Sequence, residues 1–418
     1  YSIVKSKVRM KKILIIGAGI GQYFLVQKAQ EMGLYVIVVS PKGDYPAIKI
    51  ANELFECDIY DRDSIVGYAK NNNIDAVTSD QNDLMMPTVA YVAEKLRLPG
   101  NTYEQVCSYC NKEKFRNICD EINNPVPKHI VVESGLFPEY FDVPFPWIVK
   151  PVDSQSSIGI STINKKEDYP NAVDNALSKS RCKKVIVEQF FSGREYVCEG
   201  FVYKGKYYNL SFGDRIYFKN TVAPIPSQTI FPSSLDINIQ NRIIQCEQKF
   251  TQKVNPSFGI IHSEYLVNEQ GEFCIVESAI RGGGVYISSH LIPLSTGCDI
   301  NTLLLKCALG QPLIIDDIFK ALVHKISAYI CFTLPCGRIT KIEGIESLKQ
   351  LKNVVFADIR GISEGDITEP MITKGMRKGP IIVSANTDKE FLEVISQIHK
   401  VLKITVMTSN GYKNIIWE

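Results

Sequence analysis

Short apolar runs alternate with amphipathic stretches over the N-terminal part of the chain, and this alternation is the strongest constraint on its fold. Residues 13–16 and 35–39 are apolar runs of strand length, with an amphipathic helix predicted between them over residues 20–32. Two strands joined through a helix form a βαβ unit, which requires a parallel sheet covered by helices. The alternation continues to Leu98-Pro99-Gly100, where we place a domain boundary.

The pattern of apolar residues changes after this boundary. A helical stretch over residues 101–121 ends before prolines at positions 125 and 127, since proline cannot continue a helix. Residues 147–277 are strand-rich, and shorter strands with two helical pieces follow from residue 314. We therefore expect α/β and α+β architecture in three parts: a parallel α/β domain over residues 10–100, a second domain over 101–310, and a small C-terminal α+β module over 311–418.

The charge balance argues against a strongly charged partner. The 418 residues include 47 Lys and Arg against 45 Asp and Glu, a formal net charge of +2, which provides no field for nucleic acid or an anionic membrane. No apolar run approaches the roughly 20 residues that cross a bilayer. The 12 cysteines are scattered through hydrophobic segments, where they behave as small core residues in a reducing compartment. We expect a cytoplasmic protein, with Met10 as its natural start.

A glycine-rich turn follows the first predicted strand. Gly17-Ala18-Gly19-Ile20-Gly21-Gln22 resembles a dinucleotide fingerprint, but Gln22 stands where the third glycine is required. The second strand ends in Val38-Val39-Ser40-Pro41, without the acidic residue that binds a ribose. We therefore favour a tight strand-to-helix turn with a small substrate at its mouth over a nicotinamide cofactor.

A lysine stands at the end of an apolar strand, directly before a loop of small polar residues. Lys150 follows Trp147-Ile148-Val149, and the loop over residues 153–160 contains Ser154, Ser156, Ser157 and Gly159. Backbone N–H groups and hydroxyls beside a lysine form an arrangement that holds phosphates. A hairpin with a polar turn and an exposed lysine head is the alternative.

Two acids flank the next glycine-containing loop. The strand Val185-Ile186-Val187 ends at Glu188, with Gln189 and Phe190 next, and Glu195 begins another strand. Backbone groups for an adenine edge and a carboxylate for ribose hydroxyls suit an adenosine. Exposed glutamates at strand ends are the alternative.

A predicted hairpin brings two more acids together. If Asn268 pairs with Phe273 across the turn, then Glu264 faces Glu277, with Cβ atoms roughly 4.5–5.5 Å apart. Two such carboxylates repel unless a cation lies between them or one is protonated. Magnesium, which accepts a few carboxylates and completes its shell with phosphates, is the simplest solution. Two solvent-facing carboxylates are the alternative.

An arginine and three glycines follow the second acid. Arg281 precedes Gly282-Gly283-Gly284. Its guanidinium can bind a phosphate or carboxylate through two parallel bonds, while the glycines let the backbone approach the same ligand.

Taken in order, these features resemble the ATP-grasp superfamily over roughly residues 10–335. The resemblance is strongest to the branch with biotin carboxylase, carbamoyl-phosphate-synthase-like proteins and L-amino-acid ligases. That branch carries Asp-Lys-x-x-x-Arg in the linker; here Lys112 and Arg116 match, and Asn111 departs. Ala279 stands where the family usually has Asn two residues after the second acid, which affects the coordination of a second metal.

The resemblance implies a role for each motif. Lys112 and Lys150 would hold ATP phosphates under a loop from Ser154 to Gly159, and Glu264 and Glu277 would carry magnesium. The other implied ATP contacts are Ser154, Ser156, Ser157, Gly159, Glu188, Gln189, Phe190 and Glu195. Lys150 and Arg281 would be the catalytic cations.

The implied enzyme is a ligase that forms C–N bonds and releases ADP. It would use Mg²⁺ and ATP to convert a small carboxylate into an acylphosphate, which an amine or another nucleophile then attacks. A domain of the kind called pre-ATP-grasp would come first, and a mobile lid would span about residues 128–197; a homodimer is compatible with this arrangement. The alternatives are a biotin-carboxylase-like or purine-pathway enzyme and a catalytically silent ATP-binding protein.

Overall fold

The N-terminal residues form the parallel α/β domain that the apolar alternation predicts. The computed structural model describes residues 9–418 except 134, 155–157, 220, 222–223 and 285. A four-stranded parallel sheet has the order β3-β2-β1-β4. Its elements are β1 (Lys12–Ile16), α1 (Ile20–Glu31), β2 (Tyr35–Ser40), η1 (Pro46–Lys49), β3 (Glu53–Glu56), α2 (Arg62–Asn71), β4 (Ala76–Thr78) and α3 (Met86–Leu96).

Helices cover both faces of this sheet, which explains its continuous apolar strands. Ile13 and Ile15 of β1 pack with α1, whereas Leu14 and Ile16 pack toward α2 and α3. Strands buried on both faces carry apolar residues at every position instead of alternating with polar ones.

Two capped helices connect this domain to the rest of the chain. Thr102 accepts a hydrogen bond from the Gln105 backbone N–H (3.2 Å) at the start of α4 (Tyr103–Cys110). Asn111 accepts one from the Lys114 backbone N–H (3.1 Å) at the start of α5 (Lys112–Glu121). Such caps satisfy backbone donors that a helix leaves unpaired at its first turn.

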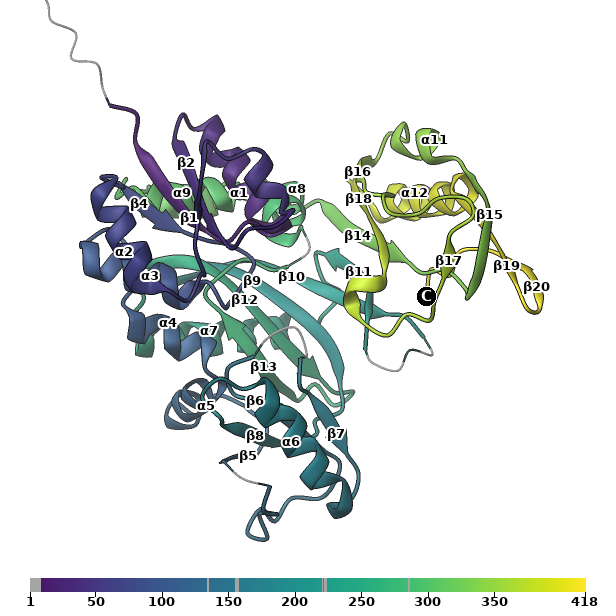
Figure 1. The fold of residues 1–418 in the computed structure, drawn as a ribbon. Helices are drawn as coiled ribbons and strands as arrows, with labels where there is room; N and C mark the ends of the chain where they lie inside the picture. Colours follow the sequence, from purple (N-terminus) through teal and green to yellow (C-terminus); the bar gives the residue numbers. More distant parts are fainter. Residues whose placement is uncertain (1–8, 134, 155–157, 220, 222–223, 285) are drawn as a thin grey trace, which may run out of the picture.

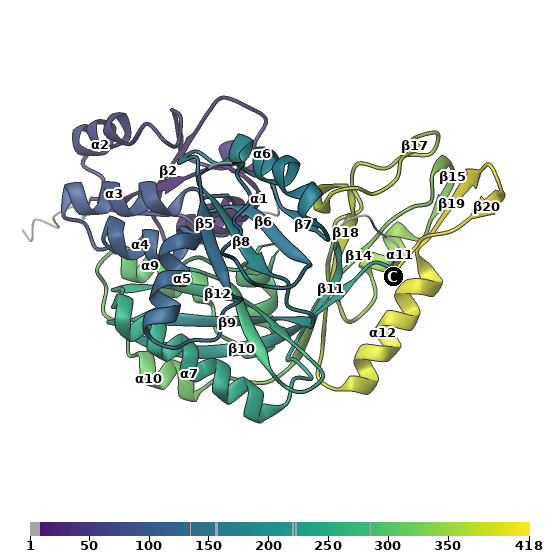
Figure 2. The same ribbon diagram turned by 90° about the horizontal axis from the view of Figure 1, so that it is seen from below.

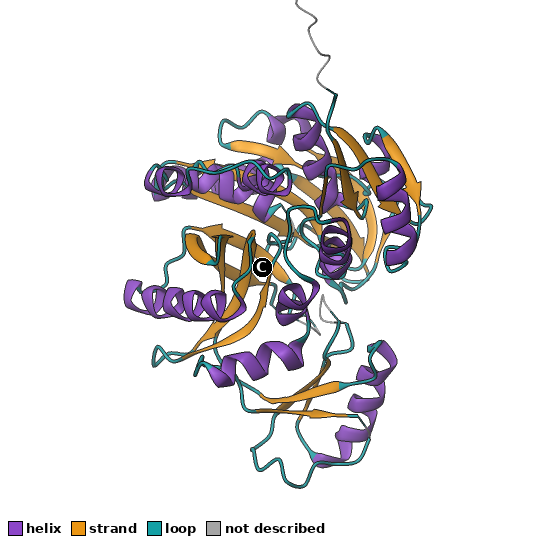
Figure 3. Ribbon diagram, turned by 90° about the vertical axis from the view of Figure 1, so that its left-hand side faces the viewer, coloured by secondary structure: helices purple, strands orange, loops and turns teal. Residues whose placement is uncertain are grey.

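A small antiparallel sheet projects from the body of the molecule (Figure 1). Its strands lie in the order β5-β8-β6-β7, and Figure 3 shows a helix packed against it. The core of this unit centres on Trp147, which is 2% exposed and stacks with Phe137 and Phe145. Its elements are β5 (His129–Val132), β6 (Trp147–Pro151), β7 (Ser161–Ile163), η2 (Lys166–Asp168), α6 (Tyr169–Lys179) and β8 (Val185–Gln189).

An eight-stranded sheet forms the centre of the molecule, in the order β13-β12-β9-β10-β11-β14-β18-β16. The sheet continues across residue 310, because β14, β16 and β18 extend it beyond β11. Its strands are β9 (Arg194–Tyr203), β10 (Lys206–Tyr217), β11 (Pro226–Phe231), β12 (Phe258–Val267), β13 (Phe273–Ala279), β14 (Ile326–Phe332), β16 (Val354–Ala357) and β18 (Lys378–Ala385).

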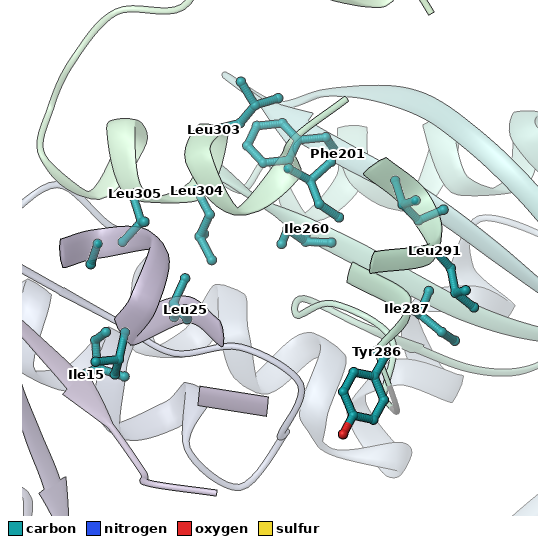
Figure 4. Packing of buried hydrophobic residues seen from close by; sticks show 14 of the residues in the cluster. Ile15, Leu25, Phe201, Ile260, Tyr286, Ile287, Leu291, Leu303, Leu304 and Leu305 are labelled. Atoms are coloured by element: carbon teal, nitrogen blue, oxygen red, sulfur yellow. The ribbon is translucent and has the colours of Figure 1, made fainter. Parts of the chain in front are cut away.

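The two faces of the central sheet have different cover. On one face, α7 (Ile237–Val254) packs together with α4 and α5. On the other, the parallel domain packs through α9 (Ile300–Ala308), and Figure 4 shows Leu25 near Leu304 and Leu305, with Phe201 and Ile260 beyond. The connecting helices on this face are the π-helix η3 (Ile287–Leu291), α8 (Ile292–Thr296) and α10 (Ile315–Lys320).

The C-terminal residues add a second small sheet, ordered β17-β15-β19-β20. Figure 2 shows α12 at the end of the molecule away from α2 and α3. These elements are β15 (Gly337–Glu343), α11 (Ile345–Lys349), β17 (Ile367–Thr368), η4 (Lys374–Met376), α12 (Asp388–Val401), β19 (Lys403–Thr408) and β20 (Gly411–Lys413). Across the described residues, no helix is both long enough and apolar enough to span a bilayer.

We expect Trp147→Ala to destabilise the small projecting sheet by about 3–5 kcal/mol, because the change leaves a large cavity among stacked rings. Hydrogen exchange of the β5–β8 amides should accelerate accordingly. Trp417→Ala is the matched control, since Trp417 packs on His399 in the C-terminal module. Unchanged exchange in β5–β8 of Trp147→Ala would contradict the assignment of this core.

Candidate active site

A buried ion triad joins α5 to the strands of the projecting sheet. Lys150 at the end of β6 lies 2.6 Å (Nζ–Oε2) from Glu188 of β8, and Arg116 of α5 lies 2.7 Å (Nε–Oε1) from the other carboxylate oxygen. Arg116 also donates from Nη2 to the Val276 carbonyl of β13 (2.7 Å). The three side chains are at most 5% exposed, so Glu188 fixes the orientation of Lys150.

The triad gives Glu188 a different environment from the expected adenine edge. Both of its carboxylate oxygens bind cations. Burial alone would raise the pKa of Glu188, but Arg116 and Lys150 outweigh burial and lower it to about 2. Beyond it, Gln189 is half-buried and the Phe190 ring is 42% exposed, so these two residues remain the candidates for contact with a base.

Lys112 lies at the base of the predicted phosphate loop. Its backbone N–H donates to the Val152 carbonyl (2.9 Å), and its Nζ donates to the Ser154 carbonyl (2.6 Å). Gly159 has φ +75°, and a Cβ there would lie 2.9 Å from Pro151 Cγ, so this position favours glycine. Ser156 and Ser157 lie outside the described residues.

The expected acid pair is present, although the turn beside it differs from the prediction. Glu264 of β12 lies opposite Glu277 of β13, as predicted. The predicted pairing of Asn268 with Phe273 is wrong: Phe273 pairs with Val267, and a β-bulge between Glu264 and Tyr265 restores the register at the acids. A bulge inserts one extra residue into one strand, so it compensates for the one-residue difference at the turn.

An arginine that no motif indicated binds both Glu264 and Glu195. Arg215 of β10 donates from Nη1 to Glu264 (2.6 Å) and to Glu195, which also accepts from the Tyr217 hydroxyl. Glu195, expected at the ribose, is therefore held by the protein itself. The signal in the sequence was weak. Arg215 is a charged residue inside the strand Phe212-Gly213-Asp214-Arg215-Ile216, and residues at even spacing along a strand lie on the same face.

A buried histidine also contacts the acid pair. His262 binds Glu199 through Nδ1, and its Nε2 lies 3.5 Å from Glu264. Burial lowers the pKa of His262, but Glu199 outweighs burial and raises it to about 9. For Glu264, burial favours the neutral form, yet Arg215 and His262 hold its pKa well below the ordinary value. Glu264 is therefore ionised at neutral pH.

Several buried polar atoms on the same face of the central sheet have no hydrogen-bond partner. Strand pairing places Arg215, Thr229 and Glu264 on one face, and Ser227 and Glu199 follow at even spacing. The atoms that lack a partner among the described residues are Glu199 Oε2, Arg215 Nε, Ser227 Oγ and Thr229 Oγ1. Buried polar atoms are normally satisfied by protein, water or ligand, so this face is suited to a polar molecule.

Arg281 meets a carboxylate of the protein. Its Nε and Nη2 donate to Asp83 (3.1 and 2.8 Å), and its Nη1 donates to the Gly282 carbonyl (3.1 Å). The Gly282 backbone N–H in turn donates to Asp80 (2.6 Å). Arg281 thus ties the loop after β13 to the parallel domain, and its expected contact with substrate stays a prediction.

A cavity of about 430 Å³ brings the predicted residues of different segments together. Lys112, Ser154, Glu277 and Ala279 all line it. The predicted phosphate lysine, the first residue of the predicted phosphate loop and one of the two predicted metal acids therefore line one cavity. Lys150 and Glu264 are not among its lining residues.

The residues at this site fit Mg²⁺ and ATP. Glu264 and Glu277 supply opposed carboxylates, the donor set that magnesium accepts while phosphate and water complete its octahedron. Lys112 and Lys150 supply amino groups for phosphate oxygens. No group of three or more His, Cys, Asp and Glu side chains among the described residues could hold a metal by itself.

The glycine turn of the parallel domain is occupied by its own glutamine. Gln22 accepts from the Gly19 backbone N–H (3.0 Å) and donates to the Asp80 carbonyl (2.5 Å). Gly17 has φ +92°, and a Cβ there would overlap Met85. The Gly19 N–H, at the position where a dinucleotide fingerprint lets the backbone approach a pyrophosphate, is therefore already bound by Gln22.

Glu188→Gln should destabilise the protein by about 3–5 kcal/mol at pH 7, because it leaves two buried cations without a counter-charge. The folded pKa of Glu188 is lowered, so its contribution is fully present above the ordinary value of 4.5 and is lost as pH falls towards 2. The difference in unfolding free energy between native protein and variant should shrink over this range. Exposed Glu269→Gln is the control; a pH-independent difference would contradict the triad's role.

Two parts of the chain match known protein families. Residues 143–289 match the ATP-grasp domain family, and residues 10–102 match the ribonucleotide synthetase preATP-grasp domain family. A formate-dependent phosphoribosylglycinamide formyltransferase from Prochlorococcus marinus is 29% identical over 188 residues, 44% of this chain and 48% of the relative. The chain thus matches about half the length of the first such relatives. One from Saccharolobus solfataricus is 23% identical over 94% of this chain and 97% of its own.

Solved structures share the whole fold. An L-amino acid ligase from Bacillus licheniformis superposes with a TM-score of 0.79 at 21% identity, over 96% of this chain and 100% of its own. A phosphoribosylglycinamide synthetase from Anaerococcus prevotii gives a TM-score of 0.76 at 19% identity, over 95% and 100%. With a pre-ATP-grasp domain followed by an ATP-grasp domain, the chain belongs to the ATP-grasp superfamily.

Proposed function

We propose that the protein is an ATP-dependent ligase that activates a small carboxylate as an acylphosphate and joins it to an amine or another nucleophile. The observation that carries this proposal is the shared cavity of Lys112, Ser154 and Glu277. It places a cation and a backbone loop for phosphates beside an acid whose strand partner is Glu264.

The proposed roles follow from the positions of the side chains. Lys112 and Lys150 bind phosphate oxygens, and Glu188 keeps Lys150 oriented through their 2.6 Å contact. Glu264 and Glu277 hold magnesium, which would neutralise charge on the phosphoryl group in transfer. Positioning and charge neutralisation account for most of the catalysis of phosphoryl transfer.

Arg281 remains the second candidate for a catalytic cation. Asp83 and the Gly282 carbonyl hold its guanidinium at the loop after β13. Each terminal nitrogen of a guanidinium carries two N–H groups, so this pairing leaves donors for a substrate carboxylate. A single arginine could then fix both the loop and the acid.

The relatives support acid activation as the chemistry. One group is named for dependence on formate, a carboxylic acid, and for formyl transfer to phosphoribosylglycinamide. A solved neighbour is named as an L-amino acid ligase. We extend the proposal to the domain plan, with residues 10–100 as the pre-ATP-grasp domain, 101–310 as the ATP-grasp domain with a lid over 128–197, and 311–418 as the wall of the substrate pocket in a cytoplasmic enzyme.

An ADP-release screen of carboxylic acids crossed with amines tests the reaction. Formate, amino acids and sugar-linked carboxylates form the acid set. With the correct acid and hydroxylamine in place of the amine, a hydroxamate should accumulate, since hydroxylamine intercepts an acylphosphate. Turnover without hydroxamate for every competent acid would exclude the acylphosphate route.

Lys112→Ala should weaken Mg-ATP binding by about 10- to 100-fold, the worth of one charge-assisted phosphate contact. This variant is cleaner than Lys150→Ala, which also removes a counter-charge from buried Glu188. Lys114→Ala on the same helix is the matched control, because Lys114 pairs with exposed Glu104. Calorimetric titration measures both, and equal ATP affinity in the two variants would contradict the nucleotide assignment.

A further inference from the structure

The cavity at the active site is also lined by residues that were not among the predicted site residues. Five of them, Tyr60, Arg62, Tyr103, Asp153 and Arg181, define the side of the cavity that we call the interdomain pocket. Tyr60 and Arg62 belong to the parallel domain, Tyr103 begins α4, and Asp153 and Arg181 belong to the projecting sheet unit. The pocket therefore lies where the parallel domain and the projecting sheet unit meet.

Two guanidinium groups face this pocket without a carboxylate partner among the described residues. Arg62 donates from Nη1 to the Tyr103 hydroxyl (3.0 Å) and from Nε to Thr88 Oγ1 (3.4 Å). The guanidinium carbon of Arg181 lies 3.2 Å from the centre of the Tyr60 ring. Lys112, which binds the Ser154 carbonyl, lines the same cavity. The cations therefore surround the cavity from three segments of the chain.

Acids also line the cavity, and their surroundings differ. Asp83 binds Arg281, and Glu277 lies opposite Glu264 in the strand pairing. Asp153 accepts the backbone N–H groups of Arg181 and Cys182 at one oxygen (3.0 and 2.9 Å). Its other oxygen, Oδ1, is buried and has no hydrogen-bond partner among the described residues. The pocket thus presents cationic donors together with a buried acceptor, Asp153 Oδ1, that requires a donor.

We propose that the interdomain pocket binds a phosphate group, which Arg62 and Arg181 hold from the two units while a hydroxyl donates to Asp153. A tetrahedral phosphate offers oxygens in several directions, and inorganic phosphate at neutral pH keeps a P–OH donor, while glycerol 3-phosphate carries the hydroxyl groups of its glycerol part. A carboxylate has two acceptor oxygens and no donor, so it would leave Asp153 unpaired. A phosphate that contacts both Arg62 and Arg181 would favour the arrangement in which the projecting unit rests against the parallel domain.

This site requires no turnover, so it does not rest on the proposed ligase reaction. Phosphate in this pocket has two sources, free inorganic phosphate and a phosphorylated metabolite. Titrations with inorganic phosphate and with glycerol 3-phosphate distinguish them, since the tighter ligand identifies the source. Glu264→Gln, which should abolish ligase turnover, should bind phosphate as the native protein does.

The decisive experiment is calorimetric titration of inorganic phosphate into native protein and variants. Arg62→Gln and Arg181→Gln should each weaken binding by about tenfold or more, the effect of losing one charge-assisted contact. Lys70→Gln on the same helix as Arg62, and Lys183→Gln two residues from Arg181, are matched controls that do not line the cavity. Arg62→Lys keeps the charge and should lose less affinity than Arg62→Gln, which separates binding from misfolding.

Sulfate tests the role of Asp153, because at neutral pH it has the shape of phosphate but no proton to donate. The native protein should prefer phosphate, and Asp153→Asn, whose amide can donate, should shift the preference towards sulfate. Equal affinity for both anions in the native protein would overturn the proposal. Absence of phosphate binding, or equal losses in the arginine variants and their lysine controls, would overturn it as well.

Discussion

The rest of the site depends on one buried carboxylate. Glu188 binds Lys150 within the projecting sheet and Arg116 from α5, and Arg116 reaches the Val276 carbonyl next to Glu277. Burying such a triad costs desolvation free energy, and proteins with apolar residues in place of a buried ion pair are often as stable. Its value is positional: one acid holds Lys150, the linker helix α5 and, through Arg116, the strand of Glu277 in a single arrangement. A lysine without this partner would be free to turn towards solvent.

Much of the fold could be predicted from local patterns, because the spacing of apolar residues along a strand or helix shows which of its faces are buried. Ile13 to Ile16 are apolar at every position, and both faces of their strand are covered. The extension of the central sheet by β14, β16 and β18 could not be predicted in the same way. These strands pair with residues far away in the chain, and no local spacing records such a pairing.

The same difference between local and long-range contacts applies to the site. Glu264 and Glu277 could be predicted because they belong to one hairpin, and a bulge preserved their pairing when the turn differed by one residue. Arg215 and His262 could not, because their roles come from neighbouring strands: Arg215 lies on β10 and binds acids from β9 and β12. For Glu188, the motif gave the position, while its two cation partners come from α5 and β6, which no local motif could predict.

Two arginines connect the parallel domain to other parts of the molecule, and their environments differ in a way that matters for motion. Arg281 binds Asp83 through two parallel bonds, and both side chains are largely buried at 9% and 16% exposure. Breaking this pair would leave a buried charge, which costs several kcal/mol. Arg181 is exposed and rests on the Tyr60 ring, a contact worth about 0.5–1 kcal/mol at such sites. The contact at Arg181 is therefore the weaker one, so any opening between the projecting unit and the parallel domain should begin there while Arg281 keeps the central sheet in place.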